Sequence, residues 1–440
     1  MSTRGEPRAQ WFRRPVTIAL IGLLAVAFAV RAADYLRAPH PVAGAGLSAE
    51  QAEMARNLVD HGKWFAVNPA AFELLKKRQA DEHRLVDPAS VDFTKADRTS
   101  RAEPAVDQMP GVASLLAAFW SVTGNEVYAP LQWLQLLLDT AMVLLVYLIA
   151  LRLTGTTRVA LLAAGLYAIW PGAIVVAKRP MLDTWAAFFT IAIVAAWLWA
   201  RDKPKSVGRL VAVGAITGLG IYFRPFVVFI PILLALVATP GGGWRRRGIW
   251  AAIPTCVALL VLAPWTIRNY QEFHRFIPTR TGLGQAVFEG SGRSASDEAS
   301  AQFVQQHQRG AKYGSPAYDD FLLSGAVRAI VDHPGQYLGQ VGRRARLLLP
   351  CLLALLVWRR WRRAALVPVA AAVATIVPYL LIGDDTRFYL PAAFAYLILI
   401  AMTVEVTIVF FGERTSRRSQ DGLTTPGETR VERARVEARR

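Results

Sequence analysis

The sequence predicts an all-α polytopic membrane protein with about ten transmembrane helices and two large extramembrane loops. Of its 440 residues, 54% are hydrophobic, and the mean hydropathy is +0.30. Repeated apolar runs are long enough to cross about 30 Å of hydrocarbon. The formal net charge is +18, but the Lys and Arg residues stand in short clusters between those runs. Such clusters are typical of membrane topology and argue against nucleic-acid binding.

The apolar runs define the predicted spans in chain order. The first, Pro15–Val30, follows a basic segment; a cleaved signal peptide is disfavoured because many spans follow and no clear A-x-A site does. The shorter run Gly111–Gly124 predicts a helix at the membrane interface. The other predicted spans are Leu131–Leu151, Val159–Ala177, Met181–Ala200, Leu210–Phe223, Pro225–Val237, Ile249–Trp265, Leu347–Trp358, Ala364–Leu381 and Phe388–Phe411.

Charge predicts the orientation, because Lys and Arg concentrate on the cytoplasmic side. Basic turns at 152–158, 201–209, 245–247 and 359–363 are therefore predicted to be cytoplasmic, and the chain turns outside at Arg224-Pro225. The predicted organisation is a cytoplasmic N-terminus (1–14), a membrane domain (15–411) with outer loops 31–109 and 268–346, and a disordered cytoplasmic tail (412–440). This topology suits a bacterial inner membrane.

Several kinds of chemistry are disfavoured. Cys256 and Cys351 both lie in apolar runs, which argues against disulfides and against a cysteine-based metal site. No phosphate-binding loop or dinucleotide-binding glycine pattern occurs. The sequence indicates no metal site and leaves a requirement for a divalent metal open.

One carboxylate of the first outer loop is a candidate general base. Glu50 lies in the first turn of a short predicted helix with a Ser48/Gln51 capping box. It could accept a proton from a hydroxyl group, or it could simply complement the helix dipole.

Three arginines lie at predicted outer membrane boundaries: Arg224, Arg268 and Arg387. The guanidinium group pairs with phosphate oxygens and stays charged. Each arginine alone could be an interfacial anchor. Their common side favours a shared anionic ligand.

The order of these features resembles the C-type (GT-C) membrane glycosyltransferases with the protein O-mannosyltransferase-like fold (glycosyltransferase family 39), over most of residues 15 to 411. The pieces that carry the resemblance are Glu50 with Ala55, Leu58 and Gly62; Met109-Pro110-Gly111; Pro171 with Lys178, Arg179 and Asp183; Phe223-Arg224-Pro225; Trp265-Thr266-Ile267-Arg268-Asn269-Tyr270; and Asp385-Thr386-Arg387-Phe388-Tyr389-Leu390-Pro391.

The resemblance implies transfer of a sugar from a polyprenyl-phosphate carrier to an acceptor hydroxyl of a lipid, glycan or protein. It implies that Glu50 or Asp107 acts as the base, and that Lys178 joins the arginines at the donor phosphate. It also implies that Asp183 and Tyr389 contact substrate. The family's usual acid stands a few residues before Glu50, where this chain has Leu47 and Ser48.

Two other functions stay open. In a transporter or lipid flippase, Asp139 and Glu405 would be proton or substrate sites inside the membrane. Alternatively, the chain is an envelope-assembly subunit whose active site has decayed, which the missing early acid would explain. The large outer loops favour the transferase.

Overall fold

In the computed structural model, the described residues are 14–38, 47–64, 81, 104–241, 243–293, 300, 303–304, 306–307, 314–383 and 389–423. These parts of the chain are helical and contain no β-strand. Six of their helices are long and apolar enough to cross a membrane, and a bent helix pair makes a seventh if it is one span. The chain is a helical membrane protein, as predicted. The count of about ten spans stays a prediction.

The helices fall into three groups. The long ones are α1 (Arg14–Arg37), α5 (Ala129–Thr154), α8 (Leu182–Asp202), α11 (Trp244–Phe273), α17 (Trp358–Ile382) and α18 (Leu390–Leu423). The shorter apolar ones are α4 (Gly111–Thr123), α6 (Thr157–Ala168), α7 (Pro171–Ala177), α9 (Val207–Ile221), η4 (Pro225–Val228), α10 (Phe229–Ala238), η5 (Ala345–Leu352) and α16 (Leu353–Leu356). The two polar regions contain α2 (Leu47–His61), α12 (Leu283–Gly290), α14 (Pro316–Asp332) and α15 (Pro334–Arg344).

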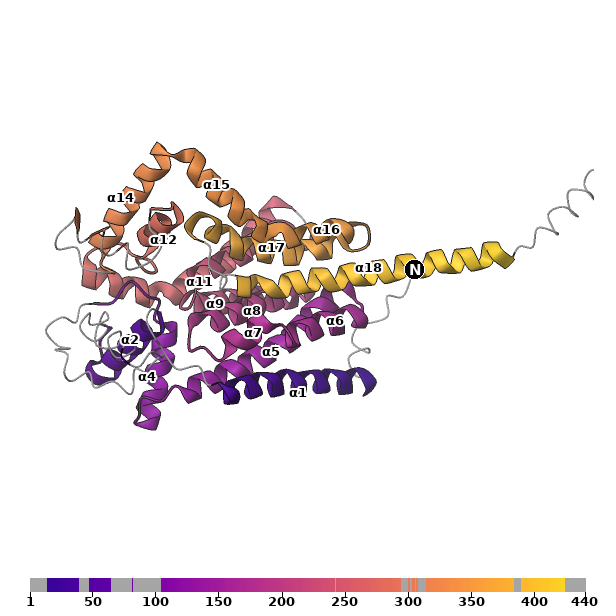
Figure 1. Ribbon diagram of the computed structural model, residues 1–440, viewed down its shortest axis with the longest axis horizontal. Coiled ribbons are helices and arrows are strands. Elements are labelled where there is room, and N and C mark those ends of the chain that lie inside the picture. Colours follow the sequence, from indigo (N-terminus) through magenta and orange to yellow (C-terminus); the bar gives the residue numbers. More distant parts are fainter. Residues whose placement is uncertain are drawn as a thin grey trace, which may run out of the picture.

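Both polar regions lie at one end of the helix bundle. In Figure 1, α2, α12 and α14 gather at the left, whereas α18 runs towards the right. Segments far apart in the sequence therefore meet beyond the same end of the bundle. The two predicted loops are therefore neighbours, although they are far apart in the sequence.

Several helix bounds differ from the prediction. Helix α1 continues to Arg37 and α11 to Phe273, so the first residues of both predicted loops are helical. Helix α18 continues to Leu423, so the start of the predicted disordered tail is helical as well. Amphipathic and charged residues can continue a helix beyond the hydrocarbon. An apolar run therefore predicts only part of the length of such a helix.

Prolines set the breaks within apolar stretches. Trp170 is extended before Pro171, which divides the predicted span Val159–Ala177 into α6 and α7 with a bend of 51°. Arg224 is likewise extended before Pro225, as expected for a residue that precedes proline. The predicted turn at Arg224-Pro225 is thus present, whereas the break at Pro171 was not predicted.

Two glycines allow α9 and α11 to pack closely. A Cβ on Gly214 would lie 2.6 Å from the Cβ of Val257, and one on Gly218 would lie 2.5 Å from the Cβ of Val261. Any side chain larger than hydrogen would therefore push the two helices apart. Arg224 follows the end of α9 and Arg268 lies near the end of α11, so the contact of these helices helps to fix the distance between the two arginines.

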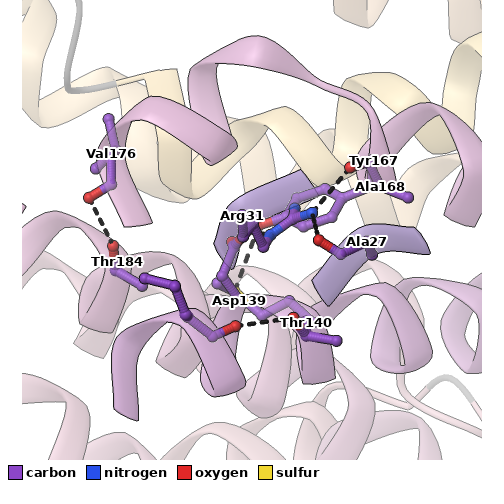
Figure 2. A network of polar contacts seen from close by, with 10 residues as sticks. Ala27, Arg31, Asp139, Thr140, Tyr167, Ala168, Val176 and Thr184 are labelled. Atoms are coloured by element: carbon purple, nitrogen blue, oxygen red, sulfur yellow. Dashed lines mark hydrogen bonds and ion pairs between the residues drawn. The ribbon is translucent and has the colours of Figure 1, made fainter. Parts of the chain in front are cut away.

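A buried ion pair joins α1 to the bundle. Arg31 and Asp139 form a salt bridge with both side chains almost fully buried. The Tyr167 hydroxyl donates to Asp139 at 2.9 Å, and Arg31 donates to the Ala168 carbonyl at 2.8 Å, where α6 ends. Figure 2 shows Arg31 among these groups. Asp139 thus faces protein, which is how a carboxylate is tolerated in a membrane.

Candidate functional site

Helix α2 is attached to α4 by polar contacts. The Gln51 side chain accepts from the Ala113 N–H at 3.0 Å, in the first turn of α4, and donates to the Met109 carbonyl at 3.3 Å. Gln51 therefore caps α4, whereas the sequence placed it in a capping box of its own helix. Ala52 and Ala55 are buried against α4, whereas Val59 of the same helix is 41% exposed.

An arginine strengthens this attachment. Arg56 donates to Glu126 from Nε at 2.5 Å and also pairs with Glu53. Burial alone would lower the pKa of the Arg56 guanidinium, but its hydrogen bond to Glu126 and the charges of both glutamates raise it. Arg56 thus stays charged and holds α2, the helix that carries Glu50, against the α4–α5 connection. The backbone of Glu50 lies in α2, but its side chain is outside the described residues.

The segment before α4 is held by two arginines of the second half of the chain. Arg268 donates to the carbonyls of Ala105 at 2.5 Å and of Trp64 at 2.7 Å. Arg280 donates to the Asp107 carbonyl at 2.9 Å and to the Gln108 side chain at 3.2 Å. Arg268, predicted at the donor phosphate, therefore fixes the first outer loop.

Asp107 occupies a tight position within that segment. A Cβ placed on Gly314 would lie 3.0 Å from the Asp107 Cγ, so α14 begins close to the carboxyl group. Burial raises the pKa of Asp107, while the charge of Arg280 and backbone N–H groups oppose that rise. A carboxylate with a raised pKa is better suited to accept a proton than an ordinary solvent-exposed one.

Arg224 is placed by its neighbours. The Phe223 ring stacks on Trp185 and Phe189, with centroids 5.0 and 5.3 Å away, which fixes the residue before Arg224. The Arg224 Nη2 pairs with the Asp183 Oδ1 at 2.5 Å, and the guanidinium lies 5.6 Å from the Tyr379 ring centre. The structure therefore brings together Arg224 and Asp183, two of the predicted site residues.

A backbone contact links Arg224 to the loop that carries Asp107. The Gly111 N–H donates to the Tyr222 carbonyl at 2.9 Å. A Cβ at Gly111 would lie 2.6 Å from that oxygen and 2.9 Å from the Phe223 ring, so only glycine fits there. This contact joins the segment Met109-Pro110-Gly111 to the segment Phe223-Arg224-Pro225.

The other predicted residues lie elsewhere or outside the described parts. Lys178 pairs with Asp34 at 2.9 Å, where α1 ends. Tyr389 is half-buried just before α18, and Arg387 is outside the described residues. Within the described ranges, no group of three His, Cys, Asp or Glu side chains is arranged to hold a metal ion.

Sequence reasoning missed Arg280 and misjudged Gln51. The sequence does not indicate a role for Arg280, because arginines are common in polar loops. The partners of both residues are backbone groups from distant segments, which no local pattern reveals. The structure also gives a role to Asn269 of the motif Trp265–Tyr270. Its side chain donates to the Ile277 and Thr279 carbonyls at 3.0 and 3.1 Å and thereby holds the chain that turns back after α11.

The chain resembles known membrane glycosyltransferases in sequence and fold. Residues 107–267 match the family model described as dolichyl-phosphate-mannose-protein mannosyltransferase. This range contains Asp107, Lys178, Asp183 and Arg224. No curated protein sequence matches the chain.

Two solved structures have a similar fold. The apo oligosaccharyltransferase of Archaeoglobus fulgidus aligns with a TM-score of 0.54 and 14% identity, covering 97% of this chain and 55% of that one. ArnT from Cupriavidus metallidurans aligns with a TM-score of 0.50 and 17% identity, covering 88% and 59%. The chain thus spans little more than half the length of either protein. A further structure of the archaeal enzyme, with a TM-score of 0.52, is in complex with an inhibitory peptide and a dolichol-phosphate.

Proposed function

The chain has the GT-C glycosyltransferase fold, and from this premise we propose that it is a membrane glycosyltransferase. It transfers a hexosyl or pentosyl group from a polyprenyl-phosphate carrier to an acceptor hydroxyl of a lipid, glycan or protein. The observation that carries this proposal is the Arg224–Asp183 pair. It lies next to the Gly111–Tyr222 contact with the first polar region and inside the segment that matches the family model.

In the proposed reaction, Arg224 contacts the donor phosphate. A carboxylate, Glu50 or Asp107, takes the proton of the acceptor hydroxyl, whose oxygen forms a bond to the anomeric carbon. The bond from that carbon to the phosphate oxygen breaks, and the lipid phosphate leaves with its negative charge against Arg224. Asp183 keeps the guanidinium in place.

The remaining polar residues have supporting roles in this proposal. Arg268 and Arg280 use their donors on carbonyl groups of the first outer loop and thereby hold Asp107. Lys178, paired with Asp34, adds positive charge near the end of α1. Tyr389 contacts the sugar or its carrier.

We place the reaction on the outer face of a bacterial inner membrane, with both termini in the cytoplasm, because the basic turns lie at the opposite side. The hydrogen bonds and the ion pair of Asp139 favour a transferase over a transporter. Its ion pair with Arg31 and its bond from Tyr167 serve packing between helices, where a proton-coupled transporter needs a carboxylate that can change partners.

The proposal is tested by incubating the purified protein with radiolabelled polyprenyl-phosphate sugars and envelope extracts. We expect label to move from the lipid carrier to an acceptor, and Arg224→Met to abolish most of this transfer. If no acceptor is labelled with any donor, and if the protein moves the lipid between the leaflets of proteoliposomes, the transferase proposal is wrong and the chain is a flippase.

A further inference from the structure

Helix α5 carries three polar side chains on one face. Gln132, Gln135 and Asp139 follow each other at spacings of three and four residues, and all three are at most 3% exposed. Buried polar groups in a membrane are costly unless they are bonded, so each needs a reason to be there. Asp139 is neutralised by Arg31, but the two glutamines make no such pair.

Both glutamines donate to the turn between α7 and α8. The Gln132 Nε2 donates to the Lys178 carbonyl at 2.9 Å. The Gln135 Nε2 donates to the Arg179 carbonyl at 2.9 Å and to the Met181 carbonyl at 3.3 Å. These three carbonyls lie between the end of α7 at Ala177 and the start of α8 at Leu182. Non-helical backbone next to the hydrocarbon depends on such donors.

This turn leads directly to the Arg224–Asp183 pair. Met181, whose carbonyl binds Gln135, is the N-cap of α8, and Asp183 lies in the first turn of that helix. The Asp183 Oδ1 in turn binds Arg224. A shift of the turn would therefore move the carboxylate that holds the guanidinium. Lys178, at the other end of the turn, would move with it.

We propose that Gln135, assisted by Gln132, is a positioning residue for donor binding. It holds the α7–α8 turn so that Asp183 presents Arg224 to the donor phosphate. The inference rests on the proposed function, because it takes Arg224 as the phosphate ligand. It gives the two buried amide side chains of α5 a role, because their N–H groups bind the carbonyls of this turn.

The matched variants are Gln135→Met and Thr140→Val. Methionine has a similar length but donates no hydrogen bond. Thr140 lies on the same helix, and its hydroxyl donates only to the Leu136 carbonyl of its own helix at 2.8 Å. Two readouts are compared in the purified full chain: amide hydrogen exchange of residues 176–186, and binding of a short-chain polyprenyl monophosphate measured by tryptophan fluorescence.

We expect Gln135→Met to speed exchange in the α7–α8 turn and to weaken lipid-phosphate binding by about 10- to 100-fold, since small displacements of a binding group have large effects. The donor KM should rise while the acceptor KM stays unchanged, which a general loss of folding would not produce. Thr140→Val should resemble the wild type in both readouts. Gln132→Met should show the same pattern as Gln135→Met to a smaller degree.

The outcomes separate this inference from the function on which it rests. A wild-type protein that does not bind the polyprenyl monophosphate would overturn the proposed function. A wild-type protein that binds it, with a Gln135→Met variant that binds equally well, would overturn the positioning role alone. Unchanged exchange in the turn of Gln135→Met would also overturn it, because the amide would then not hold that backbone.

Discussion

Arg31 and Asp139 form a buried salt bridge between α1 and α5, and Arg31 also donates to the last residue of α6. One guanidinium therefore joins three helices. Apart from this contact and the neighbouring Asp34 and Tyr35, α1 packs loosely: only 11% of its most apolar stretch is buried. Polar contacts of Arg31 and Asp34 thus contribute to holding the last turns of α1 on the bundle.

Removing one member of this pair should be worse than removing both. Asp139→Leu leaves Arg31 charged and buried, and we expect it to destabilise the protein by about 3–5 kcal/mol. The double variant Arg31→Met/Asp139→Leu should lose less than the sum of the two single variants, because no uncompensated charge remains. Thermal unfolding in detergent measures the three variants. Additive losses would show that the two charges do not depend on each other.

The α9–α11 contact gives a matched pair of glycine variants. In Gly218→Ala the new Cβ would meet Val261 and the Ala258 carbonyl, at 2.5 and 3.0 Å. We expect overpacking to cost about 1–3 kcal/mol. Gly208→Ala, in the same helix with nothing within 4 Å of its Cβ, should be neutral or stabilising by up to about 1 kcal/mol. Equal unfolding temperatures for the two variants would contradict the close packing of these helices.

The orientation is tested with single cysteines in a background without Cys256 and Cys351. A membrane-impermeant thiol reagent added from outside should label cysteines at Ser90 and at Val331, which is 70% exposed, and should leave those at Lys205 and Trp361 unlabelled. The reason is the concentration of basic turns at 201–209 and 359–363. The reverse pattern would place Asp183 and Arg224 in the cytoplasm and remove the proposed reaction from the outer face.

Much of the fold follows from hydrophobic pattern and proline position. The apolar runs located the six long apolar helices, and Arg224-Pro225 predicted a turn that the structure contains. Pro171 also follows an extended residue and breaks the helix. The sequence did not predict this break, because the run Val159–Ala177 has the length of one span. Length alone cannot distinguish a straight helix from a bent pair.

The site was less predictable, because its contacts are tertiary. Asp183 and Arg224 were both noticed, but nothing in the sequence joined them. Arg268 was expected at the phosphate because it lies at a membrane boundary, yet its guanidinium bonds to loop carbonyls. Gln132 and Gln135 bind backbone carbonyls of a turn some forty residues further along the chain. A side-chain donor that binds a backbone carbonyl has no complementary side chain, so the sequence does not indicate its partner.

The acid limb of the pH–activity profile depends on Asp107 if this residue is the base. Burial raises the pKa of its carboxyl group, and the Arg280 charge partly opposes this. The base acts when deprotonated, so activity should rise with pH through the raised pKa. Arg280→Met removes a positive charge that favours the carboxylate, so the pKa should rise further and the limb should move to higher pH. If the limb stays in place, Asp107 is not the group that titrates.

The choice between Glu50 and Asp107 can be made with two variants. Glu50→Gln keeps the size of the side chain and removes its basic oxygen, so α2 should remain attached through Gln51 and Arg56 while turnover drops by about 10² to 10⁴. Asp107→Asn is the control, since it keeps the loop contacts that run through the Asp107 carbonyl. Steady-state transfer of labelled sugar measures both. If Glu50→Gln transfers sugar at nearly the wild-type rate and Asp107→Asn does not, Asp107 is the base, and α2 serves to close the first outer loop over it.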